Sequence, residues 1–357
     1  MNKLEGKMQR AKCRMQNRQG LRILKFALCS FYIAFFILGG FLQANLGAAE
    51  VKERAEAEGK LMLYATFNAK DSKALTDAFH QLYPKIDAAF YRATDAALME
   101  RILTENRAGQ NFWDVAVLTS FYGHNLKKRG MFAIHDSPER KYFREGYKDE
   151  QGAWTSIYTN YAAFGYNTRA VAKSSVPKSY NDLLKPEWKG QLGMDSKAYE
   201  WFGTMLKAMG QEKGLAYMRE LAKQTQLRAG RTLLAQLVAA GEFKGGLSAY
   251  SQTFEVLKPS GAPVDWVYLN PVFANIHPTG ISAKAPHPNA ARLFMDFALS
   301  KRGQEVVRAM NRIPDRIDTP PEQARLMEGI KPVFAPTEVL ENFQSYGKMF
   351  EEIFAGR

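Results

Sequence analysis

The sequence predicts an α/β fold with a mostly parallel sheet. Short apolar strands alternate with amphipathic helices over residues 61–130, and this alternation is typical of parallel sheets with helices packed on them. The chain has 357 residues, of which 46% are hydrophobic, so it can bury cores for two domains of ordinary size. A third observation is that polar residues recur directly after successive strands.

The expected elements follow in a regular order. We expect strands at residues 61–65, 85–91, 114–118 and 191–194, and extended chain at 155–167 and 264–268. Helices are expected at residues 71–83, from Thr94, from 119 to about 130, and at 198–209, 230–240 and 253–258. Pro288 opens a further helix with a buried face. Residues 137–152 are charged and rich in turn residues, so we expect a surface loop there.

Polar residues follow three strands in succession. They are Thr66 and Asn68, Arg92 and Thr94, and Thr119 and Ser120. Ligands of parallel α/β sheets bind beyond the carboxyl ends of the strands. Any one of these residues is more typical of a helix cap or a turn. Their recurrence at three strand ends is what favours a ligand site.

Two further features suit an anionic ligand. Ser196 precedes the expected helix at 198–209, and a helix N-terminus offers free backbone N–H groups to an anion. Arg92, Arg228 and Arg231 could pair with a carboxylate or phosphate, although each is more typical of a solvated surface charge. The five histidines are scattered, without the spacing of metal ligands.

The first 49 residues predict export. A basic segment, an apolar run over residues 26–42 and small residues ending at Ala49 are typical of a cleaved secretory signal; the alternative is an uncleaved membrane anchor. Both cysteines, Cys13 and Cys29, lie in this segment, which excludes disulfides from the mature chain. The segment carries +7 of the net charge of +13, and the remaining +6 is weak support for nucleic-acid binding. We expect a periplasmic protein.

The chain resembles the solute-binding proteins of bacterial ABC importers, in the group that includes ferric-iron-binding proteins. The resemblance rests on Tyr166-Asn167-Thr168, on Trp188-Lys189-Gly190-Gln191-Leu192-Gly193, and on Ala285-Pro286-His287. It implies a two-lobe type II periplasmic-binding-protein fold with a hinged cleft. Lobe 1 would hold residues 50–157 and 275–314, and lobe 2 residues 158–274 and 315–357. It also implies a monomer that delivers a small solute to an inner-membrane ABC permease, with neither enzymatic activity nor a cofactor.

The sequence differs from the iron-binding members at the positions that bind their cargo. Those members bind iron with two adjacent tyrosines, a histidine and a glutamate, and these fall here on Ser251, Gln252, Asn68 and Thr119. The resemblance therefore implies a polar or anionic organic solute, including phosphorus-containing ones, rather than bare iron. The expected ligand contacts are Thr66, Asn68, Arg92, Thr94, Thr119, Ser120, Tyr158, Asn160, Ser196, Tyr250 and Ser251.

Three alternatives remain open at this point. Tyr250 lies one place out of register with the tyrosine pair and could join Tyr158 in a non-standard iron site. A periplasmic enzyme on the same fold would need a catalytic constellation, and Glu200 near Asp195 is more typical of a pair of helix caps. A ligand sensor that signals to a membrane receptor has the same sequence features as a transport protein.

Overall fold

The computed structural model describes residues 49–356. The chain divides into two compact units, residues 1–54 and residues 55–357. In the described part of the first unit, Arg54 pairs with Glu50 at 2.5 Å. The predicted secretory signal lies almost wholly in residues 1–48, outside the described residues. Over residues 49–356 the structure has no helix that is both long enough and apolar enough to span a membrane.

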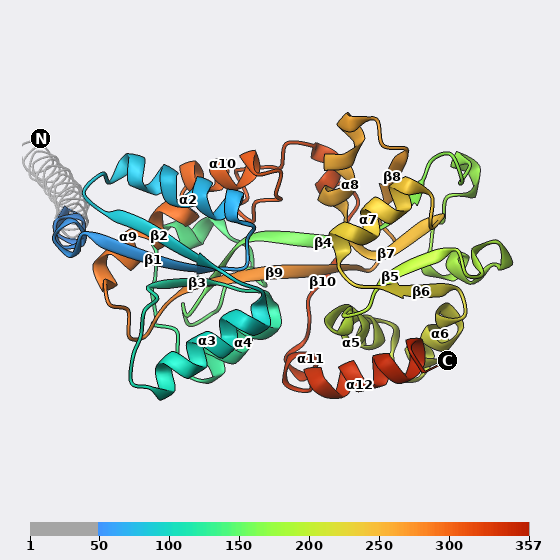
Figure 1. Cartoon of the computed structure of the whole chain (residues 1–357), viewed down its shortest axis with the longest axis horizontal. Helices are drawn as coiled ribbons and strands as arrows, with labels where there is room; N and C mark the ends of the chain where they lie inside the picture. Colours follow the sequence, from blue (N-terminus) through green and yellow to red (C-terminus); the bar gives the residue numbers. More distant parts are fainter. Residues whose placement is uncertain (1–48, 357) are drawn as a thin grey trace, which may run out of the picture. The chain divides into compact units, whose positions relative to one another are not determined.

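The larger unit is built on one ten-stranded sheet with the order β2-β1-β3-β9-β4-β7-β5-β6, to which β8 and β10 add at β4 and β9 (Figure 1). Pairing is parallel at β1–β2, β1–β3, β5–β6 and β5–β7, but β9 runs antiparallel to β3 and β4. The expectation of a mostly parallel sheet is therefore right for each end and wrong for the centre. The strands are β1 (Lys60–Ala65), β2 (Asp87–Arg92), β3 (Val115–Val117), β4 (Thr155–Asn167), β5 (Leu192–Asp195), β6 (Thr225–Arg228), β7 (Gly245–Tyr250), β8 (Val264–Val267), β9 (Val272–Ile281) and β10 (Pro332–Val333).

Two long strands join the two ends of the sheet. Every residue of β4 is buried, and so is every residue of β9. The first half of β4 pairs with β9, and its second half pairs with β7 and β8. Gly165 lies in that second half, where an added Cβ would come within 1.8 Å of the Phe254 ring. A glycine is therefore required for α8 to pack this closely on β4.

Helices cover both faces of the sheet at each end. At one end α2, α9 and α10 lie on one face and α3 and α4 on the other; at the other end α7 and α8 lie opposite α5, α6 and α12 (Figure 1). The helices are α2 (Ala69–Leu82), α3 (Asp95–Arg107), α4 (Ser120–Lys128), α5 (Tyr199–Met209), α6 (Gln211–Ala222), α7 (Arg231–Ala240), α8 (Ser251–Leu257), α9 (Pro288–Leu299), α10 (Lys301–Ala309), α11 (Thr337–Glu341) and α12 (Phe343–Phe354).

Four apolar clusters fill the spaces between helices and sheet. Phe79 and Phe294 lie under α2 and α9, whereas Trp113 packs beneath α3 and α4. Trp201 and Phe254 belong to the two clusters at the other end. Two clusters at each end, connected by β4 and β9, give the two-lobe α/β architecture predicted from the sequence. The lobe boundaries at particular residues stay a prediction.

The segment 137–152 differs from its prediction. It contains a short 3-10 helix, η1 (Pro138–Tyr142), and its Arg140 and Asp149 are only 8% and 6% exposed. Arg140 donates to the Trp154 carbonyl at 2.9 Å and to Thr155 Oγ1 at 2.6 Å. The expected surface loop is wrong in this respect, because its charged residues anchor it to the start of β4.

Candidate functional site

Two sets of helix N-termini meet near the centre of the sheet. The helices α2, α3 and α4 begin after β1, β2 and β3, whereas α5, α7 and α8 begin after β5, β6 and β7. Asn275 on β9 lies between the two sets: it accepts a hydrogen bond from Ser120 Oγ at 3.3 Å and donates to the Tyr250 hydroxyl at 2.7 Å. We call this region the strand-end site. Its first wall holds Thr66, Asn68, Arg92, Asp95, Thr119 and Ser120, and its second wall holds Asp195, Glu200, Arg231, Tyr250 and Gln252.

Side chains that follow β1 and β2 bond within the first wall. Asn68 caps α2 by accepting a hydrogen bond from the Asp71 backbone N–H at 2.9 Å. Thr66 Oγ1 donates to the Val117 carbonyl at 3.3 Å, and Arg92 Nε donates to the Phe67 carbonyl at 3.1 Å. These hydrogen bonds stabilise the fold, and the ligand contacts predicted for the three residues stay predictions.

Thr119 and Asp95 form a second local pair. The backbone N–H and the hydroxyl of Thr119 both donate to Asp95 Oδ1, at 2.8 and 3.0 Å. Burial raises the pKa of Asp95, and these two hydrogen bonds oppose the rise. Thr94 caps α3 without a side-chain hydrogen bond. The first wall thus presents a carboxylate whose main partners already lie beside it.

Arg231 dominates the second wall. It is the first residue of α7, its Nη1 lies 3.2 Å from Asp195 Oδ2, and its Nε donates to the Ser248 carbonyl at 3.1 Å. The guanidinium lies 5.0 Å from the centroid of the Tyr250 ring. Its side chain remains 24% exposed. Arg231 is therefore held in place from its own side and still accessible to a solute.

Glu200 keeps one oxygen without a hydrogen-bond partner in the described part of the chain. It lies in the first turn of α5 and is 8% exposed, and the oxygen without a partner is Oε1. Burial raises the pKa of Glu200 to about 7; the Ser120 hydroxyl and Arg231 oppose the rise, and the negative charge of Asp95 adds to it. A buried acceptor without a partner costs free energy that a bound donor would recover.

The positions that the sequence resemblance matches to iron ligands hold neutral side chains. Gln252 Nε2 donates to Asn160 Oδ1, while Gln252 Oε1 is buried without a partner in the described part of the chain. Ser251 Oγ accepts a hydrogen bond from the Tyr268 hydroxyl at 2.8 Å. Asn160 therefore positions Gln252, and Gln252 offers a second unmet acceptor.

Of the two tyrosines considered as iron ligands, Tyr158 is buried and Tyr250 is half-buried. Tyr158 stacks on His277 with ring centroids 3.8 Å apart, and Arg312 lies 4.6 Å from its ring. Burial raises the pKa of both Tyr158 and Tyr250, which disfavours the phenolate form that binds iron. Over residues 49–356, no group of three or more His, Cys, Asp or Glu side chains is arranged to hold a metal ion.

Ser196 lies at the edge of the second wall. It is half-buried, and its backbone N–H donates to the Arg228 carbonyl at 2.8 Å. The helix α5 begins three residues later, between the carboxylates of Asp195 and Glu200. The anion-binding role predicted for Ser196 stays a prediction.

Comparison with known proteins identifies the family. Residues 110–337, well over half of the chain, match the family described as bacterial extracellular solute-binding protein. The chain belongs to this family. The solute-binding protein is 25% identical over 191 residues to an Fe(3+)-binding periplasmic protein from Serratia marcescens, in an alignment that covers 51% of this chain and 56% of that relative. The match thus spans little more than half of the relative's length.

Solved structures share the fold of the solute-binding protein. A ferric binding protein from Campylobacter jejuni superposes with a TM-score of 0.72 at 19% identity, covering 82% of this chain and 99% of that one. The periplasmic binding protein AfuA from Actinobacillus pleuropneumoniae, with exogenous fructose 6-phosphate bound, gives a TM-score of 0.64 at 21% identity, covering 84% and 97%. The type II periplasmic-binding-protein fold predicted from the sequence is confirmed.

Proposed function

We propose that this protein captures a small, hydroxyl-bearing anion at the strand-end site and delivers it to an inner-membrane ABC permease. The observation that carries the proposal is the meeting of one accessible arginine with two buried, unpartnered acceptors. Arg231 is suited to the anionic group, since a guanidinium binds carboxylates and phosphates through paired N–H donors.

The two unpartnered acceptors suit hydroxyl groups at the other end of the solute. Glu200 Oε1 and Gln252 Oε1 are buried without hydrogen-bond partners among the described residues. Each would gain a partner from a solute hydroxyl, and neither can be satisfied by an anion alone. Asp95 and Asp195 do not oppose the anion strongly, because burial raises the pKa of Asp95 and so favours its neutral form, and Arg231 and the Gly230 N–H bind Asp195.

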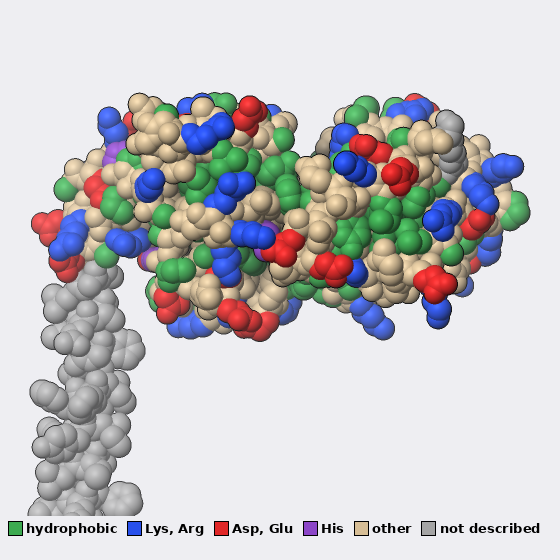
Figure 2. All heavy atoms as spheres, turned by 90° about the horizontal axis from the view of Figure 1, so that it is seen from below, with side chains coloured by type: hydrophobic (Ala, Val, Ile, Leu, Met, Phe, Trp, Pro, Cys, Tyr) green, Lys and Arg blue, Asp and Glu red, His purple; other side chains and the backbone are tan. Residues whose placement is uncertain are grey.

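The relatives support a solute of this class. AfuA holds fructose 6-phosphate on the same fold, and a sugar phosphate combines the phosphate that suits Arg231 with the hydroxyls that suit Glu200 and Gln252. The relatives named above are binding proteins, which favours capture over catalysis. Figure 2 shows acidic and basic side chains interspersed on the face that carries α3, α4, α11 and α12, so that face is not a basic stripe for nucleic acid.

A thermal-shift series tests the solute class. Fructose 6-phosphate should raise the melting temperature of the purified protein more than fructose or inorganic phosphate does at the same concentration, because only the phosphate ester engages both ends of the site. An equal shift with phosphate alone would remove the hydroxyl contacts from the proposal. A larger shift with ferric citrate, together with a visible tyrosinate-to-iron colour, would favour iron.

Export and transport need a separate test. Protein recovered from the periplasm should begin at Glu50 or within a few residues of it. Deleting the gene should lower uptake of the radiolabelled cargo that the thermal-shift series identifies, and expression in trans should restore it. Membrane-retained full-length protein, or unchanged uptake, would contradict the delivery role and leave the binding result standing.

A further inference from the structure

A cavity lies beside β4, apart from the strand-end site. Its volume is about 280 Å3, and its walls include Tyr147, Tyr161, Pro314, Asp315, Pro320 and Met327. Asp95, Glu200 and Arg231, which belong to the strand-end site, do not line this cavity. The cavity adjoins the strand that connects the two ends of the sheet. Its lining combines three prolines, two tyrosines and Met327 with one carboxylate, Asp315, and two arginines, Arg144 and Arg316.

That carboxylate is unmatched. Asp315 is 7% exposed, and within the described residues neither of its oxygens has a hydrogen-bond partner. Thr159, whose side chain lowers the pKa of Asp315, also has a buried hydroxyl without a partner among the described residues. Burial raises the pKa of Asp315 to about 7, while Ser156, Thr159 and the positive charge of Arg144 oppose the rise. A buried carboxylate is unfavourable unless a cation or a hydrogen-bond donor pairs with it.

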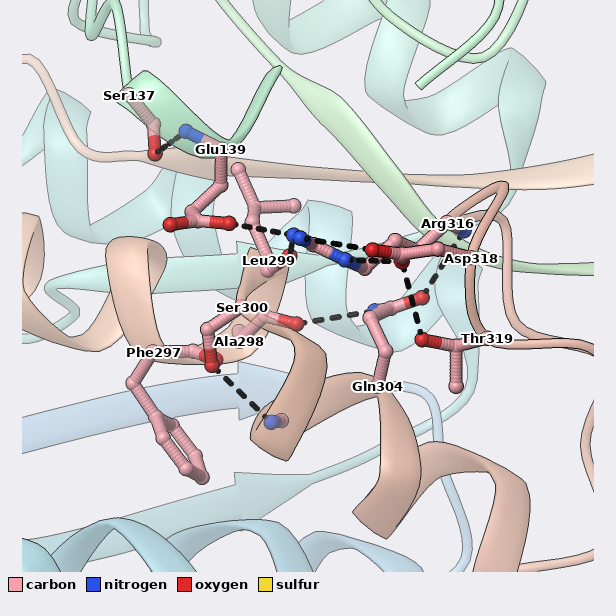
Figure 3. A network of polar contacts seen from close by, with 11 residues as sticks. Ser137, Glu139, Phe297, Ala298, Leu299, Ser300, Gln304, Arg316, Asp318 and Thr319 are labelled. Carbon is pink, nitrogen blue, oxygen red and sulfur yellow. Dashed lines mark hydrogen bonds and ion pairs between the residues drawn. The ribbon is translucent and has the colours of Figure 1, made fainter. Parts of the chain in front are cut away.

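Neighbouring cations do not supply the partner. Arg316 is the next residue, but its guanidinium is bound by Glu139 at 2.5 Å, by Asp318 at 2.6 Å and by the Leu299 carbonyl at 2.8 Å (Figure 3). Its side chain is 5% exposed, so it is fixed in this network. Arg144 is exposed, and among residues 49–356 the structure gives its guanidinium no hydrogen bond or ion pair. The Tyr147 and Tyr161 hydroxyls bond to each other at 2.7 Å.

We propose that this cavity binds a small organic ammonium ion, with the ammonium group on Asp315 and its alkyl part against the apolar wall. An ammonium offers donors for both Asp315 oxygens. The tyrosine rings and Met327 suit a short alkyl chain and add cation–π attraction. A bare metal ion would leave most of the apolar wall uncovered. Because the cavity lies against β4, its occupant braces the connecting strand against residues 314–321.

The test uses n-butylammonium chloride at pH 8, where Asp315 is ionised, with 1-butanol and sodium butyrate as matched probes without the positive charge. Thermal shift and calorimetry are run on the full protein, on Asp315→Asn, and on Asp136→Asn as a control whose side chain is 96% exposed. Butylammonium should raise the melting temperature of the wild type and the control, and the two uncharged or anionic probes should not. Asp315→Asn should weaken binding tenfold or more, as expected for loss of a charged hydrogen bond of about 1.5–3 kcal/mol.

Arg144→Gln keeps the test decisive if Asp315→Asn does not fold. Removing the cation at the rim should strengthen butylammonium binding, because less positive charge then competes for Asp315. An equal shift in wild type and Asp315→Asn would place the amine elsewhere and overturn the proposal. So would the absence of any shift in the wild type, or unchanged affinity in Arg144→Gln.

Discussion

The two walls of the strand-end site use their polar residues differently. In the first wall, Asn68 caps a helix, Thr119 binds Asp95, and Thr66 and Arg92 bond to backbone carbonyls. In the second wall, Glu200 and Gln252 each keep a buried oxygen without a partner in the described chain. Polar residues at strand ends therefore stabilise the fold in one wall and leave unmet groups in the other. The unmet groups are the better guide to where a solute binds.

The largest expected effect concerns Glu200 and pH. Its pKa is about 7 in the folded protein against an ordinary value of 4.5, so between these pH values the unfolded carboxyl ionises while the folded one keeps its proton. The free energy of unfolding of the wild type should therefore fall relative to that of Glu200→Gln by roughly 3 kcal/mol as pH rises from about 4.5 to about 7. Above about pH 7 the gap, meaning the difference in free energy of unfolding between the two proteins, should stay constant. Below about 4.5 both states are protonated and the gap should be smallest.

Urea denaturation of the two proteins at several pH values measures this difference. Glu338→Gln, on an exposed side chain, is a suitable control. A gap between wild type and Glu200→Gln that is the same at pH 4 and pH 8 would mean that Glu200 is not held in an unfavourable place. The contrast between the two walls would then lose its main support.

Asn68→Ala should affect stability and spare binding. Loss of the α2 cap removes the hydrogen bond to the Asp71 N–H and should lower the free energy of unfolding by about 1 kcal/mol. Affinity for the cargo should stay within about twofold, since Asp71 already engages both the carbonyl and the NH2 group of the Asn68 side chain. Calorimetry alongside denaturation separates the two outcomes. Weakened binding with unchanged stability would return Asn68 to the ligand contacts predicted from the sequence.

The smallest effect is expected at Ser196. Its hydroxyl has no hydrogen bond among residues 49–356, and Asp195 and Glu200 lie on either side of the helix start that it precedes. Ser196→Ala should therefore change affinity by less than about twofold. A tenfold loss, measured by calorimetry, would show that the anion binds at the start of α5 rather than at Arg231.

Much of the fold could be predicted from local patterns. The extended run at 155–167 coincides with β4, because its apolar and aromatic residues are all buried. The strand β6 was not predicted, since Thr225–Arg228 is short and mostly polar. Burial of Arg140 and Asp149 was also missed, because their hydrogen bonds to other parts of the chain are invisible in a charged, turn-rich segment.

The site could be predicted only in part. The sequence located the strand ends, and the structure brings Thr119, Ser120, Tyr250 and Asn160 to the strand-end site. Glu200 and Arg231 were interpreted as a helix cap and a surface charge, the commoner roles of such residues. Their meeting with Asp95 depends on how α3, α5 and α7 converge. Sequence spacing does not carry that information, and the unpartnered oxygens become visible only once all neighbours are in place.

Arg231 provides the most direct test of the central claim, that the strand-end site receives the anionic end of a hydroxyl-bearing solute. Calorimetry compares fructose 6-phosphate with fructose on the wild type, on Arg231→Ala, and on Arg228→Ala, whose arginine pairs with Glu242 at 2.7 Å. The wild type and Arg228→Ala should prefer the phosphate ester by about 10- to 100-fold, the value of a charged hydrogen bond, and Arg231→Ala should lose that preference. An Arg231→Ala protein that keeps the full preference would contradict the account.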